Sequence, residues 1–369
     1  MRLLEWGLLL AGLAAGLLLI RAVWQLAEWN KARILVKHGG ISQVDKVVLG
    51  GVTQSILIQS SSRGLPVLLV LHGGPGMPVP GVGARGNKRT FNLTTQELLS
   101  QFTVVYWDQR GTGRSSPKEL DPSTMNFEQL VADAYQLSGW LTRQFEVDKI
   151  YLCGLSWGSM LGLQLAARHP EKFHAYCGVA QIINWTQSDI QGYDWMLEQA
   201  LGTGNKKAYR GLLKIGPPPY EDNLPNWNEF RKWLMLLGGY TGRNGTQKPA
   251  GLLPFIAALL KSPDYRLRDL AHIFSKGMKL SYSPQMLKDI HVYAAERSIG
   301  RLKIPVQFIH GVHDQACPAD LLERFCVQLE APAGKSVVWL NNAAHIFSPE
   351  DAQTAENELI KLLSRNLSR

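Results

Sequence analysis

The sequence predicts an α/β fold: a mostly parallel sheet with helices on both faces, a helical lid insertion and an N-terminal transmembrane helix. Three observations predict it. Short β-rich runs alternate with helical stretches over residues 42–180, the alternation stops over residues 181–300, and it resumes over residues 301–369. Such alternation is typical of parallel sheets covered by helices. Hydrophobic residues make up 45% of the 369 residues and charged residues 19%, which excludes a disordered chain.

Residues 1–30 are predicted to form a membrane anchor and linker. Residues 6–20 (WGLLLAGLAAGLLLI) are uncharged and would span about 22 Å as a helix, short of a bilayer core of about 30 Å. Arg21 can snorkel, however, and Trp6 and Trp24 are spaced like the two interfacial aromatic belts. A cleaved signal peptide is the alternative, but no A-x-A-like site follows the apolar run. The excess of basic residues after this segment predicts a cytoplasmic body.

The first part of the core, residues 42–180, begins with a predicted hairpin over residues 44–49 and 52–59. A helix is predicted over residues 127–145, because apolar residues recur at helical spacing and Asn126 is placed to cap it. The other predicted elements of this part are strands over residues 66–72, 102–108, 149–155 and 176–179, and a helix over residues 157–168.

Residues 181–300 are rich in tryptophan and tyrosine and contain a proline run at residues 217–219. An aromatic insertion at this point predicts a lid that shapes a pocket and excludes water. The alternative is that the aromatic residues only fill the small core of the lid. The second part of the core, residues 301–369, is predicted to contain strands over residues 304–310 and 336–340 and helices over residues 319–329 and 349–363.

Charge and cysteine content exclude several function classes. The net charge is +9, but lysines and arginines are scattered without a run of five like charges, so an anionic membrane surface is favoured over nucleic acid as a partner.

The four cysteines show neither C-x-x-C nor zinc-finger spacing. The pair His310 and His313 lacks further metal ligands nearby. The G-x-G-x-x-G string at residues 81–86 follows prolines rather than a strand. We therefore expect no metal and no cofactor.

The string GLSWG at residues 154–158 fits the G-x-S-x-G pattern. A glycine-rich chain can produce this pattern by chance, so its context decides. A predicted strand ends directly before it and a predicted helix begins directly after it, which is the strand-turn-helix setting of a nucleophile elbow. The sequence therefore predicts that Ser156 is a nucleophile.

A serine hydroxyl needs a neighbouring base, which a third group orients. Asp314 and His345 each follow a predicted strand, at the sheet edge where such sites assemble. With Ser156 they make the chain order serine, acid, histidine. The alternative is a solvated aspartate and a surface histidine, but order and position agree for all three residues. We expect Asp314 to orient His345 and His345 to act as the base.

The string HGGPG at residues 72–76 follows another predicted strand. In this arrangement a backbone N–H after such a strand supplies one oxyanion donor, and the residue after the nucleophile supplies the other. We expect the N–H groups of Gly74 and Trp157 to be these donors, with Gly73 as the alternative to Gly74. Loss of one donor typically costs about 3 kcal/mol of transition-state stabilisation.

Three motifs together resemble those of the prolyl aminopeptidase (proline iminopeptidase) family of α/β-hydrolases. They are HGGPG at residues 72–76, DQRGTGRS at 108–115 and GLSWGS at 154–159, in this order. The resemblance extends from residue 42 to the carboxyl end. It implies the α/β-hydrolase fold, the triad of Ser156, Asp314 and His345, no cofactor, and release of an amino-terminal residue, proline in the named activity, from peptides. We then expect Asp108, Arg110 and Arg114 to brace the oxyanion loop, which is the HGGPG segment at residues 72–76.

Members of this family bind the free amino group of the substrate with acidic residues of the lid. Glu198 and Glu229 are the main candidates for this role, and Asp194 and Glu221 are further ones. With the same triad, a carboxylesterase or thioesterase acting on hydrophobic acyl groups is the alternative, so the substrate is a peptide or a small ester or amide. A non-catalytic binding protein of this fold is disfavoured, because it would not need nucleophile, acid, base and oxyanion loop together.

Overall fold

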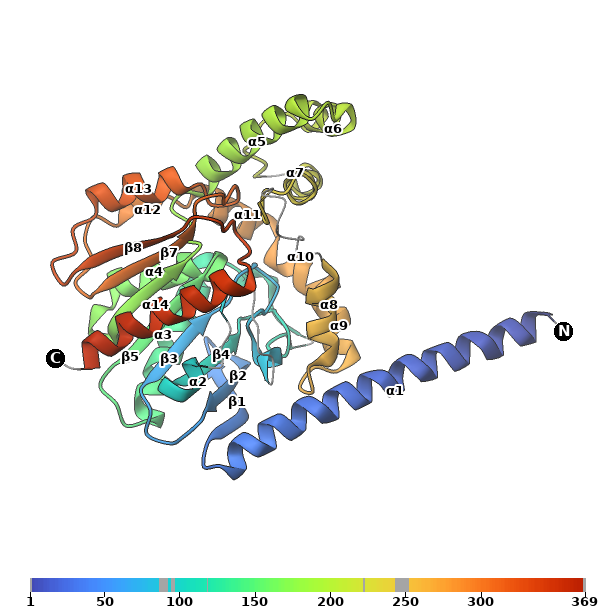
Figure 1. Cartoon of the computed structure of the whole chain (residues 1–369), viewed down its shortest axis with the longest axis horizontal. Coiled ribbons are helices and arrows are strands. Elements are labelled where there is room, and N and C mark those ends of the chain that lie inside the picture. Colours follow the sequence, from blue (N-terminus) through green and yellow to red (C-terminus); the bar gives the residue numbers. More distant parts are fainter. Residues whose placement is uncertain are drawn as a thin grey trace.

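The computed structural model describes residues 2–85, 92, 93, 97–117, 119–221, 223–242 and 252–367; within these ranges the side chains of residues 2–5, 7–11, 252–255, 258 and 363–367 are outside the description (Figure 1). Its centre is an eight-stranded sheet in the order β1-β2-β4-β3-β5-β6-β7-β8. The predicted hairpin is present: β1 (Ile41–Leu49) pairs with β2 (Val52–Ser60) in antiparallel register, and β2 pairs with β4 (Thr103–Asp108) in the same sense.

All other strand pairs are parallel, as predicted. Four of these parallel strands, β3, β4, β5 and β7, are buried at every residue, since helices cover both faces of the sheet. The prediction of a mostly parallel sheet with helices on both faces is confirmed. The remaining strands are β3 (Val67–Leu71), β5 (Ile150–Leu155), β6 (Phe173–Val179), β7 (Val306–Gly311) and β8 (Lys335–Leu340).

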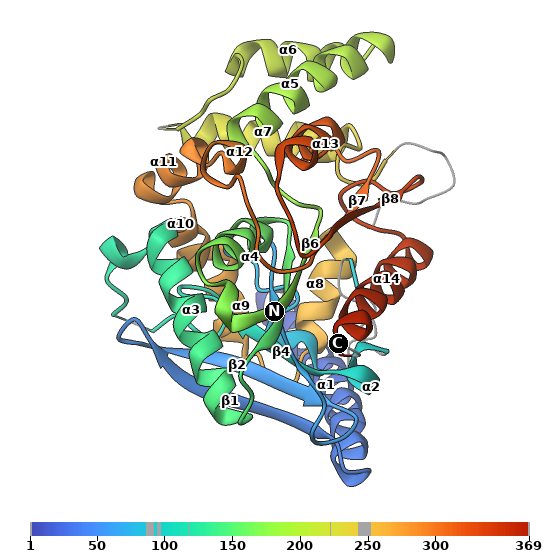
Figure 2. The ribbon, with the colours of Figure 1, turned by 90° about the vertical axis from the view of Figure 1, so that its left-hand side faces the viewer.

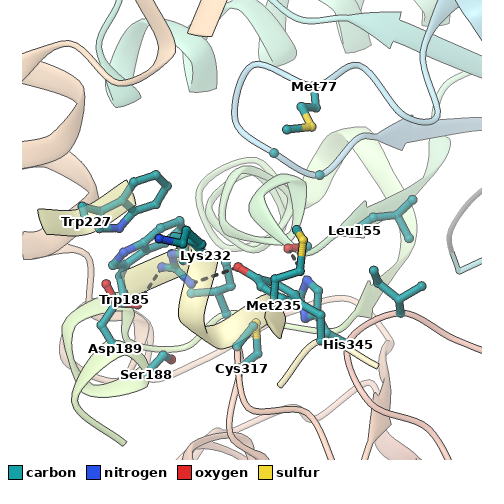
Figure 3. Close-up of a pocket in the computed structure, with 18 of the residues that line it drawn as sticks. Met77, Leu155, Trp185, Ser188, Asp189, Trp227, Lys232, Met235, Cys317 and His345 are labelled. Atoms are coloured by element: carbon teal, nitrogen blue, oxygen red, sulfur yellow. Dashed lines mark hydrogen bonds and ion pairs between the residues drawn. The ribbon is translucent and has the colours of Figure 1, made fainter. Parts of the chain in front are cut away.

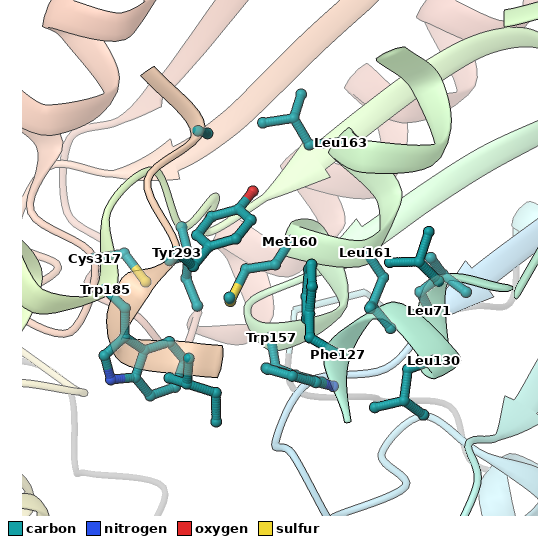
Figure 4. Close-up of a cluster of buried hydrophobic side chains, with 14 of the residues drawn as sticks. Leu71, Phe127, Leu130, Trp157, Met160, Leu161, Leu163, Trp185, Tyr293 and Cys317 are labelled. Atoms are coloured by element: carbon teal, nitrogen blue, oxygen red, sulfur yellow. The ribbon is translucent and has the colours of Figure 1, made fainter. Parts of the chain in front are cut away.

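Two hydrophobic clusters, one on each face, hold the helices to the sheet. One cluster joins α3 (Phe127–Gln144), α4 (Trp157–Arg168) and α13 (Ala319–Gln328) to the sheet. Figure 4 shows its centre, where the rings of Phe127 and Trp157 meet edge to face at 5.9 Å. The other cluster contains α2 (Leu98–Gln101) and α14 (Pro349–Leu367). The predicted cap of α3 is confirmed, since the Asn126 side chain accepts the N–H of Gln129.

The segment between β6 and β7 is helical. In Figures 1 and 2, α5, α6 and α7 stack at one end of the molecule, away from α1. The helices of this segment are α5 (Trp185–Gly202), α6 (Lys206–Ile215), α7 (Leu224–Leu236), α8 (Leu252–Lys261), α9 (Leu267–His272), the π-helical turn Ile273–Gly277, α10 (Met278–Ser281), α11 (Pro284–Val292) and α12 (Ala295–Ser298). Short 3₁₀ turns elsewhere cover Val82–Ala84, Pro122–Thr124 and Pro170–Lys172.

The amino terminus forms one helix, α1 (Arg2–Lys37), which extends beyond the predicted segment of residues 1–30. Figure 1 shows its first half projecting from the body. Farther along, Arg21 Nη2 donates to the Tyr265 carbonyl (2.6 Å) and Gln25 Nε2 to the Ser262 carbonyl (2.7 Å). The transmembrane helix was predicted over residues 6–20, and the side chains of residues 7–11 are not among those described. Among the described residues, none of the helices has the length and apolar character needed to cross a membrane.

Candidate active site

Ser156 lies at the sharp turn between β5 and α4, with φ 50° and ψ −118°. A non-glycine residue rarely adopts this conformation, which marks a strained position of the kind found at functional sites. Glycines make the turn possible. A Cβ on Gly158 would collide with the carbonyl oxygens of Leu71 and His72, and one on Gly154 would lie 2.6 Å from the Gly158 carbonyl oxygen.

A continuous hydrogen-bond chain joins the three predicted triad residues. The Ser156 hydroxyl lies 2.9 Å from His345 Nε2, and His345 Nδ1 lies 2.7 Å from Asp314 Oδ2. The second carboxylate oxygen of Asp314 accepts the N–H groups of Ala316 and Cys317, each at 2.8 Å. Asp314 follows β7 and His345 follows β8, so the ends of two parallel strands bring the acid and the histidine to the elbow. The Asp314 carboxylate is thus held by two backbone N–H groups and is hydrogen-bonded to the His345 imidazole.

The same atoms form a cluster that resembles a metal site. Potential ligand atoms of Asp314, Cys317 and His345 lie within 4.8 Å of one another. His345 Nδ1 and Asp314 Oδ2 are hydrogen-bonded to each other, however, so both atoms are already used. Burial raises the pKa of the Cys317 thiol well above its usual value, whereas a cysteine binds metal as the thiolate. The donor set therefore suits a hydrogen-bond relay better than a metal ion.

The loop after β3 approaches the elbow closely. A Cβ on Gly73 would lie 3.4 Å from that of Ser156, and Gly74 adopts φ +127°, a conformation that favours glycine. Both glycines line the same cavity as Ser156. Trp157 is the first residue of α4, so its N–H has no acceptor within the helix. The predicted oxyanion donors thus lie on the two segments that flank Ser156.

The Gln109 side chain bridges these two segments. Its Nε2 donates to the His72 carbonyl (3.2 Å), and its Oε1 accepts the indole N–H of Trp157 (2.9 Å). Its backbone N–H donates to His72 Nε2 (3.3 Å), and His72 Nδ1 contacts the Gly73 carbonyl (2.6 Å). Burial lowers the pKa of His72 to about 4, so its imidazole is neutral near pH 7. Gln109 follows β4 within DQRGTGRS, and its bridging role was not predicted.

The charged residues of DQRGTGRS support different parts of the fold. The Asp108 carboxylate accepts the N–H groups of Val82 (2.7 Å) and Arg114 (2.8 Å) and the Tyr265 hydroxyl (2.8 Å), which fixes the segment that follows the oxyanion loop. Arg110 instead pairs with Asp133 on α3 (2.7 Å). It also donates to the carbonyls of residues 49 and 50, so it ties the β1–β2 hairpin to α3 rather than bracing the oxyanion loop.

The candidate triad opens into a cavity of about 500 Å³. Lid helices α5, α7 and α10 supply much of its wall, and most of its lining is apolar or aromatic. Figure 3 shows Trp185 and Trp227 toward one end of the cavity and His345 toward the other. The aromatic residues of the insertion thus serve two purposes, because these tryptophans also belong to the main hydrophobic core.

One ion pair lies in this wall, and the sequence did not reveal it. Arg231 Nη2 donates to Asp189 Oδ1 at 2.6 Å, and the guanidinium carbon lies 5.1 Å from the Trp185 ring centre and 4.9 Å from that of Trp227. Burial raises the pKa of Asp189 above its usual value even though Arg231 opposes this effect. A signal was available: Trp185 and Asp189 are four residues apart on α5, and Trp227 and Arg231 are four apart on α7, so each pair shares a helix face.

The structure places the predicted amine-binding acids away from Ser156. Glu198 is exposed on α5, and Glu229 on α7 pairs with Lys232 at 2.7 Å. Neither glutamate lines the cavity. The physical reason is helix phase: Glu229 lies two residues from both Trp227 and Arg231, so it points away from the face that these residues present to the cavity.

Comparison with known proteins agrees with this fold. A family model described as alpha/beta hydrolase fold matches residues 66–208. "Probable aminopeptidase YbaC" of Bacillus subtilis is 29% identical over 321 residues, 86% of this chain and 95% of the relative. The "Proline iminopeptidase" of Xylella fastidiosa (strain Temecula1) is 35% identical over 269 residues, 69% of this chain and 76% of the relative.

Solved structures share the fold at lower identity. The proline iminopeptidase-related protein of Thermus thermophilus has a TM-score of 0.58 and 19% identity, covering 88% of this chain and 99% of that one. A structure titled as a membrane phospholipase A has a TM-score of 0.59 and 18% identity, covering 100% of both chains. At these identities only the fold follows. Together with the Xylella relative and the three sequence motifs, the comparisons show that the chain is a hydrolase that belongs to the proline iminopeptidase family of α/β-hydrolases.

Proposed function

We propose that this protein is a serine hydrolase that works through an acyl-enzyme, with Ser156 as nucleophile, His345 as base and Asp314 as the acid that orients it. The observation that carries the proposal is the hydrogen-bond chain from Asp314 through His345 to the Ser156 hydroxyl, at 2.7 and 2.9 Å. This series of hydrogen bonds ends at Ser156, whose strained turn opens into an apolar cavity. Such a constellation is what a serine needs to become a nucleophile at neutral pH.

In the proposed reaction the Ser156 oxygen attacks the substrate carbonyl carbon while its proton passes to His345 Nε2. The carbonyl oxygen becomes negative and accepts hydrogen bonds from the N–H groups of Trp157 and Gly74. His345 then gives its proton to the leaving amine or alcohol, and the bond from the carbonyl carbon to that group breaks. Water attacks the acyl-enzyme by the same route, and the carboxylic acid leaves. The Asp314 carboxylate stabilises the imidazolium that forms in each half-reaction.

Two substrate classes are compatible with this mechanism. The names of the Bacillus and Xylella relatives favour release of an amino-terminal residue, proline in type, from peptides. The apolar lining of the cavity favours a carboxylic or thiol ester with a hydrophobic acyl group. Both classes need the same triad and the same oxyanion donors, so the choice between them depends on the lid.

Attachment of the body to a membrane through α1 stays a prediction, as does a cytoplasmic location. Its support is the exposure of large apolar side chains on the described part of α1. Leu13, Leu17 and Leu19 are 61%, 68% and 67% exposed. Exposed apolar side chains of this kind leave water only when an apolar environment, such as a membrane, covers them.

The mechanism is tested by Ser156→Ala. We expect the variant to fold normally and to lose at least about 10³-fold in kcat on proline p-nitroanilide and on short-chain p-nitrophenyl esters. Asp314→Asn should also lower kcat, because the histidine loses its orienting charge. Ser100→Ala, at an exposed serine of α2, is the matched control and should leave kcat unchanged. Full activity in Ser156→Ala would contradict the proposed nucleophile.

A further inference from the structure

The carboxylate of Asp189 in the cavity wall is already neutralised by this chain. Among the described residues that line the cavity, the acidic and basic side chains apart from the His345 imidazole are Asp189, Arg231 and Lys232. Arg231 pairs with Asp189 at 2.6 Å, and Lys232 pairs with Glu229, which lies outside the cavity, at 2.7 Å. The wall therefore offers no uncompensated negative charge to a ligand.

Asp189 is also covered. It is 1% exposed, and its second oxygen, Oδ2, is buried without a hydrogen bond. Burial raises the pKa of this carboxyl above its usual value. The Trp185 and Trp227 side chains, on α5 and α7, offset part of this effect. A substrate ammonium could reach Asp189 only by displacing the guanidinium or an indole. Other charged or titratable groups that interact with Asp189 are His291, Tyr220, Tyr240 and Cys317.

Arg231 is held firmly in this position. Its guanidinium lies about 5 Å from the ring centres of Trp185 and Trp227 and of Phe230, and Nη1 contacts the Tyr240 hydroxyl at 3.4 Å. Burial is the largest single effect on the pKa of Arg231 and would lower it, but the charge of Asp189 and the interactions with Tyr240 and Tyr282 together hold the pKa above its usual value. A flat guanidinium can stack on aromatic rings with its face while its edge binds a carboxylate.

We propose that Arg231 determines substrate specificity: by occupying Asp189, it makes the cavity accept an uncharged acyl group and reject one that carries a free α-ammonium. The substrate class is then an ester or amide of an apolar or amino-blocked carboxylic acid. This inference rests on the proposed serine hydrolase function and decides between its two substrate classes. The ammonium of an unblocked residue would find no free carboxylate among the described residues of the cavity wall, and burying a charge without a partner is strongly unfavourable.

The test compares two acyl groups of equal shape. Prolyl p-nitroanilide carries the amine, whereas cyclopentanecarbonyl p-nitroanilide has a carbon in its place. We expect the full-length wild type to show a kcat/KM at least about tenfold higher for the cyclopentane compound at pH 6.5. In Arg231→Gln the Asp189 carboxyl has lost its arginine partner and can pair with the prolyl ammonium instead, so the ratio should shift by at least about tenfold toward the prolyl compound. The double variant Asp189→Asn, Arg231→Gln should lose that gain.

Binding to Ser156→Ala provides a readout that does not depend on turnover. Calorimetry with prolinamide and cyclopentanecarboxamide should show tighter binding of the cyclopentane amide below pH 7. Binding of prolinamide should improve as pH rises through the pKa of its amine, about 8 for an α-amino group, while the cyclopentane amide should not respond. A purely structural role for Arg231 would not produce this difference between the two ligands.

The control is Arg168→Gln, which removes an arginine from an exposed pair with Glu128 outside the cavity and should not move the ratio. Wild type that prefers the prolyl compound, or an Arg231→Gln variant with an unchanged ratio, would overturn the inference and leave the serine mechanism intact. Absence of any Ser156-dependent cleavage would overturn the proposed function instead. The calorimetric comparison would still decide the specificity of the cavity, and tighter binding of prolinamide at pH 6.5 would overturn the inference by itself.

Discussion

His72 connects the loop of residues 72–76 to the segment after β4, and we expect this connection to depend on pH. Its imidazole is buried and neutral, with Nε2 accepting the Gln109 N–H while Nδ1 contacts the Gly73 carbonyl. Protonation would put a charge in an apolar site and remove the acceptor for Gln109. Because Gln109 also holds Trp157, the loss would reach both segments expected to donate to the oxyanion.

We therefore expect His72 to make the protein less stable in acid. The pKa of His72 is lowered to about 4 by burial, below the 6.5 of an exposed histidine. The stabilisation is thus fully present above pH 6.5 and is lost as pH falls toward 4, a change of up to about 3 kcal/mol. Urea unfolding at pH 7 and pH 5 should show a smaller loss in His72→Gln than in wild type. His38→Gln, at an exposed position, should behave as wild type, and equal losses in all three proteins would contradict the prediction.

At the scale of single residues, the sequence predicted those whose position follows from backbone connectivity. Ser156, Asp314 and His345 each lie within five residues of the end of a strand, and parallel strands end at one edge, so their meeting follows from strand order. Asp189 and Arg231 were not predicted, because their contact depends on how α5 docks against α7. Periodicity predicts which face of each helix is apolar, but it does not predict which residues of two helices meet.

At the scale of elements, the turn between β5 and α4 depends on glycines for space rather than for flexibility. Gly158 packs so closely under the β3 end that a methyl group would strike two backbone oxygens. Gly139, on α3, has only the Arg143 guanidinium near its Cβ position, at 3.5 Å. We therefore expect substitution by alanine to have opposite effects on stability at Gly158 and Gly139.

Gly158→Ala should destabilise the protein by about 3 kcal/mol or more, since backbone cannot yield without moving β3 or the elbow. Gly139→Ala should instead stabilise it by about 0.5–1 kcal/mol, because alanine loses less conformational entropy than glycine in a helix. Thermal unfolding of both variants beside wild type measures the two effects. Similar melting temperatures for the two variants would contradict the prediction, because they would show that the turn can accommodate a methyl group at residue 158.

Several element boundaries were predicted to within one residue. The helix predicted over residues 127–145 is α3 (Phe127–Gln144), and the strand predicted over residues 66–72 is β3 (Val67–Leu71). The terminal helix α14 extends to Leu367 rather than residue 363. The helices of the insertion were not predicted individually, because their apolar faces pack against each other and against the core, which blurs the pattern of a one-sided surface helix.

At the scale of the whole molecule, the cavity exists because the insertion between β6 and β7 returns over the strand ends where Ser156 and His345 lie. The sheet positions the candidate triad, and the helices α5 and α7 form part of the wall of the cavity into which it opens. If the proposed function holds, chemistry and selectivity depend on separate parts of the chain, so we expect that the insertion can change without moving the candidate triad.

Helix α1 belongs to neither part. The described residues 12–30 of α1 are absent from the cavity wall, and α1 contacts the body through β1, α8 and the Tyr265 region. A chain that lacks residues 1–30 should therefore hydrolyse a soluble p-nitrophenyl ester with unchanged kcat/KM. If the exposed leucines of α1 attach the protein to a membrane, the full chain should float with anionic liposomes in a sucrose gradient and the shortened chain should not. Flotation of both chains would place the attachment in the body, and flotation of neither would contradict membrane attachment through α1.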